Sequence, residues 1–231
     1  MKRLLIANRG EIACRIAASA RRHAIDSVAV YSEADANSLH VEVADSAVAI
    51  GPAPARESYL VIDKLLDAAR SAGADAVHPG YGFLSENAQF ARAVEAAGLI
   101  WVGPTPESIE TMGDKDRARE LAQAAGVPIA GGSRAISAES MDELTATAEQ
   151  VGFPLLVKAA AGGGGIGMRR VDDPSKLADV VEATRSMAGK AFGNDSVFLE
   201  RFIANARHIE VQVFGDGQGH AIHLGERDCS V

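Results

Sequence analysis

The sequence predicts an α/β protein, in which a parallel sheet with helices on both faces is followed by a smaller α+β unit. Short apolar segments alternate with helical patterns through the N-terminal half. That rhythm changes after Gly103-Pro104. The glycine run at 162–165 then lies between two strand-like segments, which makes it the tip of a hairpin.

The first part is expected to form a Rossmann-like sheet. Apolar strands are predicted at 4–7, 27–31, 47–50, 76–78 and 100–102, with helices at 11–22, 59–71 and 87–97. The first turn, Asn8-Arg9-Gly10-Glu11, has one glycine and a carboxylate at the helix start, where the pyrophosphate of a dinucleotide would lie. The sequence therefore disfavours nicotinamide binding.

The second part is expected to begin with two linking helices and to continue as a small α+β unit that contains the glycine-tipped hairpin. Helices are predicted at 106–112 and 114–125, the second capped by Asp114 and ended by Gly126. Further elements are predicted at 140–151 (helix), 153–158 and 168–171 (strands), 174–187 (helix) and 197–202 (strand). Residues 208–214 alternate, so that His208, Glu210 and Gln212 share one face of a strand, and 221–226 return as its partner.

Composition narrows the class of function. The net charge is −8, which disfavours non-specific binding to nucleic acid or anionic membranes but permits a local cationic pocket. The chain has no apolar run of membrane-spanning length, and its start is too short for a signal peptide, so we expect a cytoplasmic protein. Cys14 and Cys229 have no metal-ligand spacing around them and are expected to be reduced and structural.

Lys158 ends an apolar strand and is followed at once by the glycine run. Glycine amides can turn toward an anion in conformations that other residues avoid, so the segment is typical of a phosphate-binding lid. Its order differs from the P-loop, where the lysine follows the glycines. A flexible linker is the alternative, and the flanking strands disfavour it. A solvated surface lysine is the alternative for Lys158, and the cost of ending an apolar strand with an unpaired charge disfavours it.

Five segments together resemble the biotin carboxylases, which are ATP-grasp enzymes, and the resemblance covers the whole chain. These segments are Asn8-Arg9-Gly10-Glu11-Ile12-Ala13, residues 78–87, Met112-Gly113-Asp114-Lys115, residues 158–168 and Arg207-His208-Ile209-Glu210-Val211-Gln212. The resemblance implies that ATP and bicarbonate form carboxyphosphate and that the carboxyl group passes to biotin on a carrier domain. It also implies Mg²⁺, a carboxyltransferase partner and a homo-oligomer, with no nucleic acid or membrane partner.

The same resemblance implies a division into domains. Residues 1–112 correspond to the Rossmann-like N-terminal domain and 113–130 to a helical linker. Residues 131–202 correspond to the ATP-grasp lid domain, and 203–231 to a truncated start of the ATP-grasp C-terminal sheet.

Site residues follow from the resemblance position by position. Lys115 and Lys158 correspond to the two nucleotide lysines, and Gly164 and Gly165 to the lid amides. The segment around the adenine corresponds to Glu200, Arg201, Phe202 and Ile203. His208 corresponds to a nucleotide-contacting histidine, with a purely structural histidine as the alternative. Tyr81 corresponds to a residue on the biotin side of the cleft.

Two departures from the family are evident. Ile166 stands where relatives have Arg or Lys, which removes a cation from the lid. Relatives also continue beyond Val231, where the Mg²⁺ ligands and the bicarbonate- and biotin-binding residues would lie, so we expect no metal ligands in this chain and no activity of it alone. A catalytically silent nucleotide-binding or assembly module and another ATP-grasp ligase remain as alternatives. The final carboxyl acceptor, whether an acyl-CoA, pyruvate or urea, would be chosen by another domain.

Overall fold

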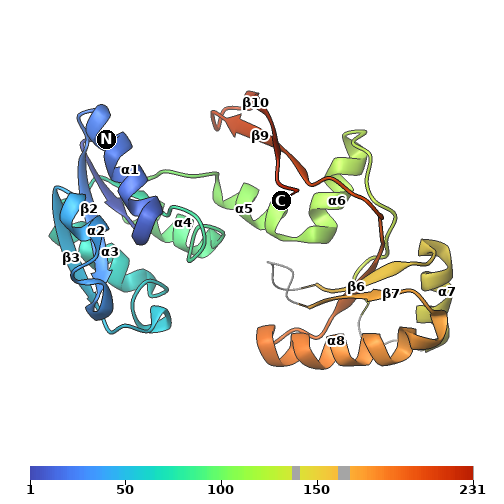
Figure 1. Ribbon diagram of the computed structural model, residues 1–231. Helices are drawn as coiled ribbons and strands as arrows, with labels where there is room; N and C mark the ends of the chain where they lie inside the picture. Colours follow the sequence, from blue (N-terminus) through green and yellow to red (C-terminus); the bar gives the residue numbers. More distant parts are fainter. Residues whose placement is uncertain (137–140, 161–166, 231) are drawn as a thin grey trace. The chain divides into compact units, whose positions relative to one another are not determined.

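The computed structural model describes residues 1–136, 141–160 and 167–230 (Figure 1). The chain divides into two compact units, residues 1–113 with 215–220, and residues 114–214 with 221–231. Each unit has a hydrophobic core of its own. Across the described ranges, no helix has both the length and the apolar character that a membrane crossing requires.

The first unit contains the predicted parallel sheet. Its strands are β1 (Arg3–Ile6), β2 (Asp26–Ser32), β3 (Ser46–Gly51), β4 (Ala76–His78) and β5 (Ile100–Trp101). All neighbouring pairs are parallel, in the order β3-β2-β1-β4-β5. The chain order reverses between β1 and β4, and the carboxyl ends at such a switch point form the usual ligand crevice of an open α/β sheet.

Helices cover both faces of this sheet, as predicted. The helices of this unit are α1 (Gly10–Arg22), α2 (Leu39–Val43), α3 (Ile62–Ser71), α4 (Ala88–Ala96) and α5 (Pro106–Gly113), which packs on α4, with 3₁₀ turns at Glu33–Asp35 and Ala55–Glu57. Side chains alternate along β1, so that Leu4 and Ile6 pack with α1 while Leu5 packs with α3 and α4 on the other face. The helix predicted at 59–71 begins at Ile62 in the structure, so its predicted start was wrong. The short helix α2 was not predicted.

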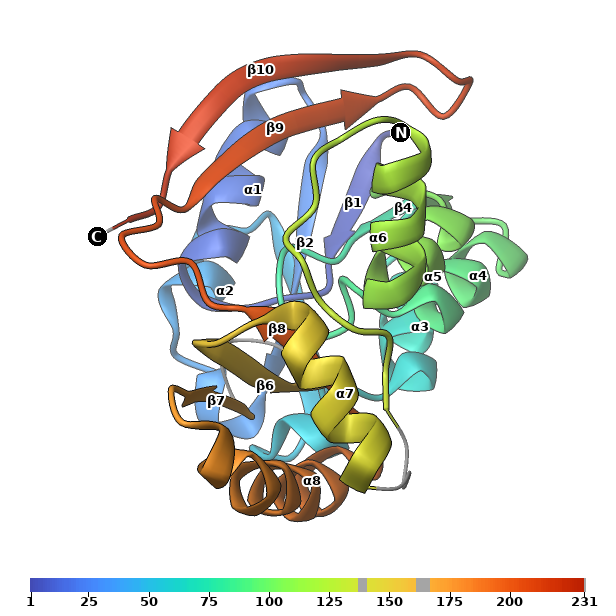
Figure 2. The same ribbon diagram turned by 90° about the vertical axis from the view of Figure 1, so that its right-hand side faces the viewer.

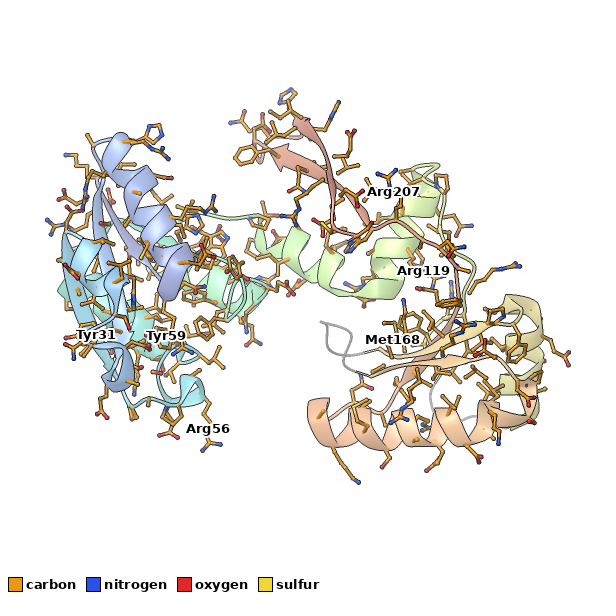
Figure 3. The ribbon with its side chains drawn as sticks, in the orientation of Figure 1. Tyr31, Arg56, Tyr59, Arg119, Met168 and Arg207 are labelled. Atoms are coloured by element: carbon orange, nitrogen blue, oxygen red, sulfur yellow. The ribbon has the colours of Figure 1, made fainter. Side chains whose placement is uncertain are left out.

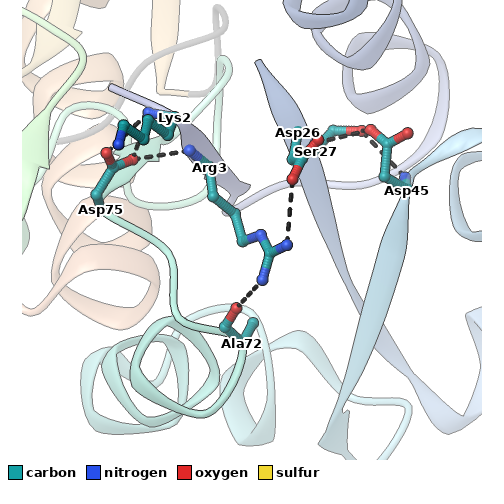
Figure 4. A network of polar contacts seen from close by, with 7 residues as sticks. All are labelled: Lys2, Arg3, Asp26, Ser27, Asp45, Ala72 and Asp75. Carbon is teal, nitrogen blue, oxygen red and sulfur yellow. Dashed lines mark hydrogen bonds and ion pairs between the residues drawn. The ribbon is translucent and has the colours of Figure 1, made fainter. Parts of the chain in front are cut away.

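The amino ends of the strands are held together by a polar network (Figure 4). The Asp75 carboxylate accepts hydrogen bonds from the backbone N–H groups of Lys2 (2.7 Å) and Arg3 (2.9 Å), and the Arg3 bond is the largest cause of the lowered pKa of Asp75. The Arg3 guanidinium donates to Asp26 at 3.1 Å and to the Ala72 carbonyl at 3.0 Å. These contacts close the end of the sheet opposite the switch-point crevice.

The second unit carries the remaining elements. They are α6 (Lys115–Ala124), α7 (Met141–Val151), β6 (Leu155–Ala159), β7 (Met168–Val171), a 3₁₀ turn (Pro174–Lys176), α8 (Leu177–Phe192), β8 (Val197–Arg201), β9 (Ile209–Gly215) and β10 (Ala221–Asp228). The cap predicted for α6 is confirmed, because the Arg117 N–H donates to Asp114 Oδ1 at 3.1 Å and Gly126 has a φ of +73°. The α8 helix continues past the predicted end at 187 and stops where Gly193 adopts a φ of +70°.

Strands β7, β6 and β8 form an antiparallel sheet in that order. On β6, Leu155, Val157 and Ala159 are buried, and the first two lie in the core formed with α7 and α8. Leu156 and Lys158 alternate with them and point to the opposite face. Figures 1 and 2 show α7 and α8 beside the sheet. One face of the sheet is therefore covered by α7 and α8, and within the described residues no helix is packed on the opposite face, which we call the open face.

Strands β9 and β10 pair with each other in a separate two-stranded sheet. Apolar side chains on β10 are exposed, with Ile222 at 61% and Leu224 at 70%. On β9, Val211 and Val213 are also exposed.

Candidate active site

The open face of the β7-β6-β8 sheet carries a cation and an anion in contact. Lys158 on β6 and Glu200 on β8 form an ion pair, and both side chains are 24% exposed. Leu156 lies opposite Glu200 in the register, so the pair is a diagonal cross-strand contact. A freely solvated lysine is not what the structure shows. Lys158 is a half-buried cation with a carboxylate partner that a more highly charged anion could displace.

Flat and polarisable side chains lie on the same face. The Arg170 guanidinium stacks 4.1 Å above the Phe202 ring centroid. Met168, opposite Lys158 in the register, is 46% exposed and points away from α8 (Figure 3). Met168 and Arg170 were not predicted as site residues, because their pairing with Lys158 and Leu156 depends on strand register. Together with Lys158 they form a surface that suits a purine ring next to a phosphate chain.

The segment from Glu200 to Ile203 is held from both sides. The Arg201 N–H donates to the Gly131 carbonyl at 2.8 Å, and the Phe202 N–H donates to the Pro154 carbonyl at 3.0 Å. Ile203, by contrast, is 57% exposed. Because the N–H groups of Arg201 and Phe202 already have protein acceptors, a base bound at this segment would have to use other backbone groups.

His208 lies next to the start of β9, in a separate polar cluster. Its Nε2 is 3.5 Å from Glu210 Oε1, while Glu210 Oε2 accepts hydrogen bonds from Arg227 at 2.6 Å and from Gln212 at 3.4 Å. The prediction that His208, Glu210 and Gln212 share one face is confirmed. The Arg227 hydrogen bond and charge lower the pKa of Glu210, which therefore stays ionised.

In the first unit, the turn that contains Tyr81 is held at the switch point. The Asn8 side chain donates to the carbonyls of Pro79 (2.7 Å) and Tyr81 (2.8 Å), and the Tyr81 hydroxyl donates to Glu11 at 2.5 Å. A Cβ on Gly80, which has a φ of +67°, would lie 2.7 Å from the Asn8 amide nitrogen. Only glycine therefore permits this close approach. The Tyr81 ring itself is 62% exposed and available to a ligand.

Two titratable groups at this turn have shifted pKa values. Burial, with a smaller contribution from the Arg15 charge, lowers the pKa of His78. The neutral ring can then accept a hydrogen bond at Nδ1 from the Gly80 N–H, 3.0 Å away. The hydrogen bond to Glu11 raises the pKa of Tyr81, so its hydroxyl remains a donor.

Several predicted site residues lie outside the part of the chain that the structure describes. Gly164, Gly165 and Ile166 belong to the segment 161–166. The backbone of Lys115 begins α6, but its side chain is not among those described.

Two family matches divide the chain. Residues 1–109 match the family described as the N-terminal domain of biotin carboxylase. Residues 114–231 match the family described as the ATP-binding domain of the carbamoyl-phosphate synthase L chain.

Curated relatives match over nearly the whole chain. The biotin carboxylase of Pseudomonas aeruginosa is 52% identical over 231 residues, which are 100% of this chain and 51% of that protein. The propionyl-CoA carboxylase alpha chain of Ruegeria pomeroyi is 49% identical over 229 residues, 99% of this chain and 34% of that protein. The chain thus spans about half the length, or less, of these curated relatives.

Solved structures are similar as well. The biotin carboxylase domain dimer of Hydrogenobacter thermophilus 2-oxoglutarate carboxylase, in complex with MgADP, ADP and bicarbonate, has a TM-score of 0.93 and 45% identity, covering 100% of this chain and 50% of that one. The Campylobacter jejuni biotin carboxylase–β-γ-ATP complex has a TM-score of 0.94 and 44% identity, covering 99% of this chain and 51% of that one.

Proposed function

This chain belongs to the biotin carboxylase family, and from that membership we propose that it supplies the nucleotide-binding part of an enzyme that carboxylates biotin with ATP and bicarbonate. The reaction would proceed through carboxyphosphate, with biotin presented on a carboxyl carrier domain. The observation that carries the proposal is the Lys158–Glu200 pair on the open face of the sheet. It places a preorganised cation on the same face as Met168 and the Arg170–Phe202 stack.

The residues of this chain would bind and orient the nucleotide. We propose that Lys158 leaves Glu200 and holds the phosphates, because a polyphosphate attracts the ammonium more strongly than one carboxylate does. Phe202, stacked under Arg170, and the exposed Ile203 would border the adenine. Supporting contacts proposed from the family pattern come from Lys115, Gly164, Gly165, Glu200, Arg201 and His208.

Tyr81 is proposed to line the biotin side. Its exposed ring stands on a turn that Asn8 and Gly80 hold rigidly, which suits a residue that positions a substrate. ATP would supply the activated phosphoryl group, with Mg²⁺ neutralising charge on the phosphates. The Mg²⁺ ligands are not assigned to any residue of this chain.

The proposal extends to assembly. Because relatives include alpha chains of acyl-CoA carboxylases, we propose a biotin carboxyl carrier domain and a carboxyltransferase as partners, and a homo-oligomer like the dimer of the Hydrogenobacter thermophilus domain. We also propose the domain division at 112, 130 and 202. We propose further that residues 1–231 alone bind nucleotide without turnover.

A chimaera tests the function directly. Residues 1–231 are joined to the remaining half of the Pseudomonas aeruginosa relative, and phosphate release is measured with ATP, bicarbonate and free biotin. We expect release that requires all three, ATP binding by residues 1–231 alone, and no release from either half alone. ATP cleavage that ignores both bicarbonate and biotin would contradict the proposal and favour another ligase.

A further inference from the structure

The open end of the β9–β10 hairpin brings together three side chains of metal-binding type. One ligand atom each from His208, Glu210 and Cys229 lies within 4.8 Å of the others. The spacing of residues around Cys229 shows no metal motif, because its neighbours come from the paired strand rather than from nearby sequence. The fold therefore creates a cluster that local sequence conceals.

The backbone fixes the spacing of this cluster. The Cys229 N–H donates to the His208 carbonyl at 2.7 Å, and the His208 N–H donates to Ser230 Oγ at 2.7 Å. These bonds hold His208 opposite the end of β10. Glu210 follows two residues along β9, so its side chain points to the same face as His208.

The two oxygens of Glu210 have different environments. Oε2 is held by Arg227 at 2.6 Å, whereas Oε1 faces His208 Nε2 at 3.5 Å. A carboxylate that is anchored through one oxygen presents the other in a fixed direction, which is how outer partners orient metal ligands. Arg227 also interacts with the Cys229 side chain, so its positive charge lies against two of the three groups and would limit their affinity for a cation, although Glu210 Oε1 remains unoccupied by Arg227.

We propose that in the nucleotide-free chain His208, Glu210 and Cys229 bind a zinc-like divalent ion, with the fourth position open to water, and that His208 exchanges this ion for the nucleotide contact proposed above. Imidazole, thiolate and carboxylate together suit Zn²⁺, whereas the sulfur ligand disfavours Mg²⁺. Tetrahedral bonds to Zn²⁺ place such ligand atoms about 3.5 Å apart. The ligand atoms, which lie within 4.8 Å of one another, can approach to this distance by side-chain rotation, because the side chains of His208 and Glu210 are 67% and 37% exposed. Binding releases the Cys229 thiol proton to solvent.

Cobalt is the probe that reports the sulfur ligand. Co²⁺ added to the whole chain should produce a thiolate charge-transfer band in the near ultraviolet that saturates at one equivalent and is abolished by one equivalent of Zn²⁺. Cys229→Ser should remove the band, and His208→Ala should weaken Zn²⁺ binding by at least about tenfold, the scale for losing part of a metal site.

Matched controls come from the same chain. Cys14→Ser removes the other cysteine and should keep the band. His220→Ala should keep the Zn²⁺ affinity, because His220 lies at the opposite end of the hairpin, where its Nδ1 is paired with Asp216 at 2.8 Å.

Three results would overturn the site: the absence of a band in the unmodified chain, a band that survives Cys229→Ser, or Zn²⁺ affinity unchanged in Glu210→Gln. Circular dichroism checks that each variant folds. If Cys229→Ser does not fold, alkylation of the unmodified chain decides the question. Zn²⁺ should slow iodoacetamide modification of Cys229 at least about tenfold relative to Cys14, and equal protection of both cysteines would refute the site.

Discussion

Lys158 and Glu200 depend on each other, because each is a half-buried charge whose partner lies on a different strand. Removing one partner leaves the other ionised without compensation, which costs more than the pair contributes. A loss of nucleotide binding in a single variant could therefore come from local unfolding rather than from a lost contact.

Lys158→Ala should weaken ATP binding by about 1.5–3 kcal/mol, the range for one charged hydrogen bond. The double variant Lys158→Ala/Glu200→Ala should recover stability but not affinity. Calorimetric titration of ATP measures binding, and urea unfolding measures stability. Lys176→Ala, at an exposed lysine of the same unit, is the control. Full ATP affinity in the Lys158→Ala chain would return Lys158 to the class of surface lysines.

His78 gives the first unit a pH-sensitive stability. Its pKa in the folded state lies below the ordinary value of 6.5, so the neutral form stabilises the fold above pH 6.5 and this contribution is lost as pH falls through the folded pKa. Between about pH 7.5 and 5.5, His78→Gln should flatten the decline in unfolding free energy, by at most about 1.4 kcal/mol per pH unit. His23→Gln, at an exposed position, is the matched control for replacing a histidine by glutamine. Parallel stability curves for the His78 variant and the original chain would refute this role.

Among the elements, β7 is preceded by Gly167, whose surroundings leave little room for a side chain. Gly167 has a φ of +83°, its carbonyl accepts from the Ala159 N–H at 2.9 Å, and a Cβ there would lie 2.9 Å from the Ala159 Cβ and 3.0 Å from the Met187 Cε. Gly152 offers a comparison, because its φ is +81° while nothing lies within 4 Å of an added Cβ.

Gly167→Ala should therefore destabilise the second unit more than Gly152→Ala does. Both substitutions force alanine into the left-handed region, at a cost of about 1–2 kcal/mol. Only Gly167→Ala adds overpacking, which costs about 1–3 kcal/mol more. Thermal unfolding of the two variants measures the difference. Equal losses would show that Met187 moves aside without cost.

Prediction of elements from sequence succeeded where an apolar run was bounded by clear turn signals. The five strands of the parallel sheet were predicted within a residue or two of their bounds, because each is an apolar run between turn signals. The α2 helix was missed because five residues are too few to show a helical period. The start of α3 was misplaced because Tyr59 is buried and was interpreted as the first core residue of the helix. Tyr59 instead precedes the helix, and its hydroxyl donates to Asp35 in the 3₁₀ turn Glu33–Asp35 at 2.7 Å.

At the scale of the whole molecule, the two cores have no residue in common. Leu5 in the first and Leu155 in the second are both completely buried. This arrangement explains why the sequence analysis could anticipate two packed parts from the change in rhythm after Gly103-Pro104. The site was harder to anticipate. Lys158 and His208 could be identified as single residues. Their neighbours Glu200 and Cys229 could not, because both contacts depend on strand register, which one sequence does not specify.

Two transitions are expected on unfolding. Leu5→Ala should lower the midpoint temperature of one transition and Leu155→Ala that of the other, because truncating a buried leucine usually costs about 2–5 kcal/mol of unfolding free energy. Differential scanning calorimetry of both variants tests this. A single transition that shifts equally in both would show that the cores unfold as one cooperative unit.

The alternation along β6 also determines which substitutions natural variation can tolerate. Positions 155, 157 and 159 face the core and should accept only apolar residues of similar volume, whereas 156 and 158 face the open side. In a library that varies all five positions, losses at the first three should appear as reduced protein abundance. Losses at 158 should appear as reduced ATP binding at normal abundance. Selection would thus alternate along β6, acting on folding at one position and on ligand binding at the next.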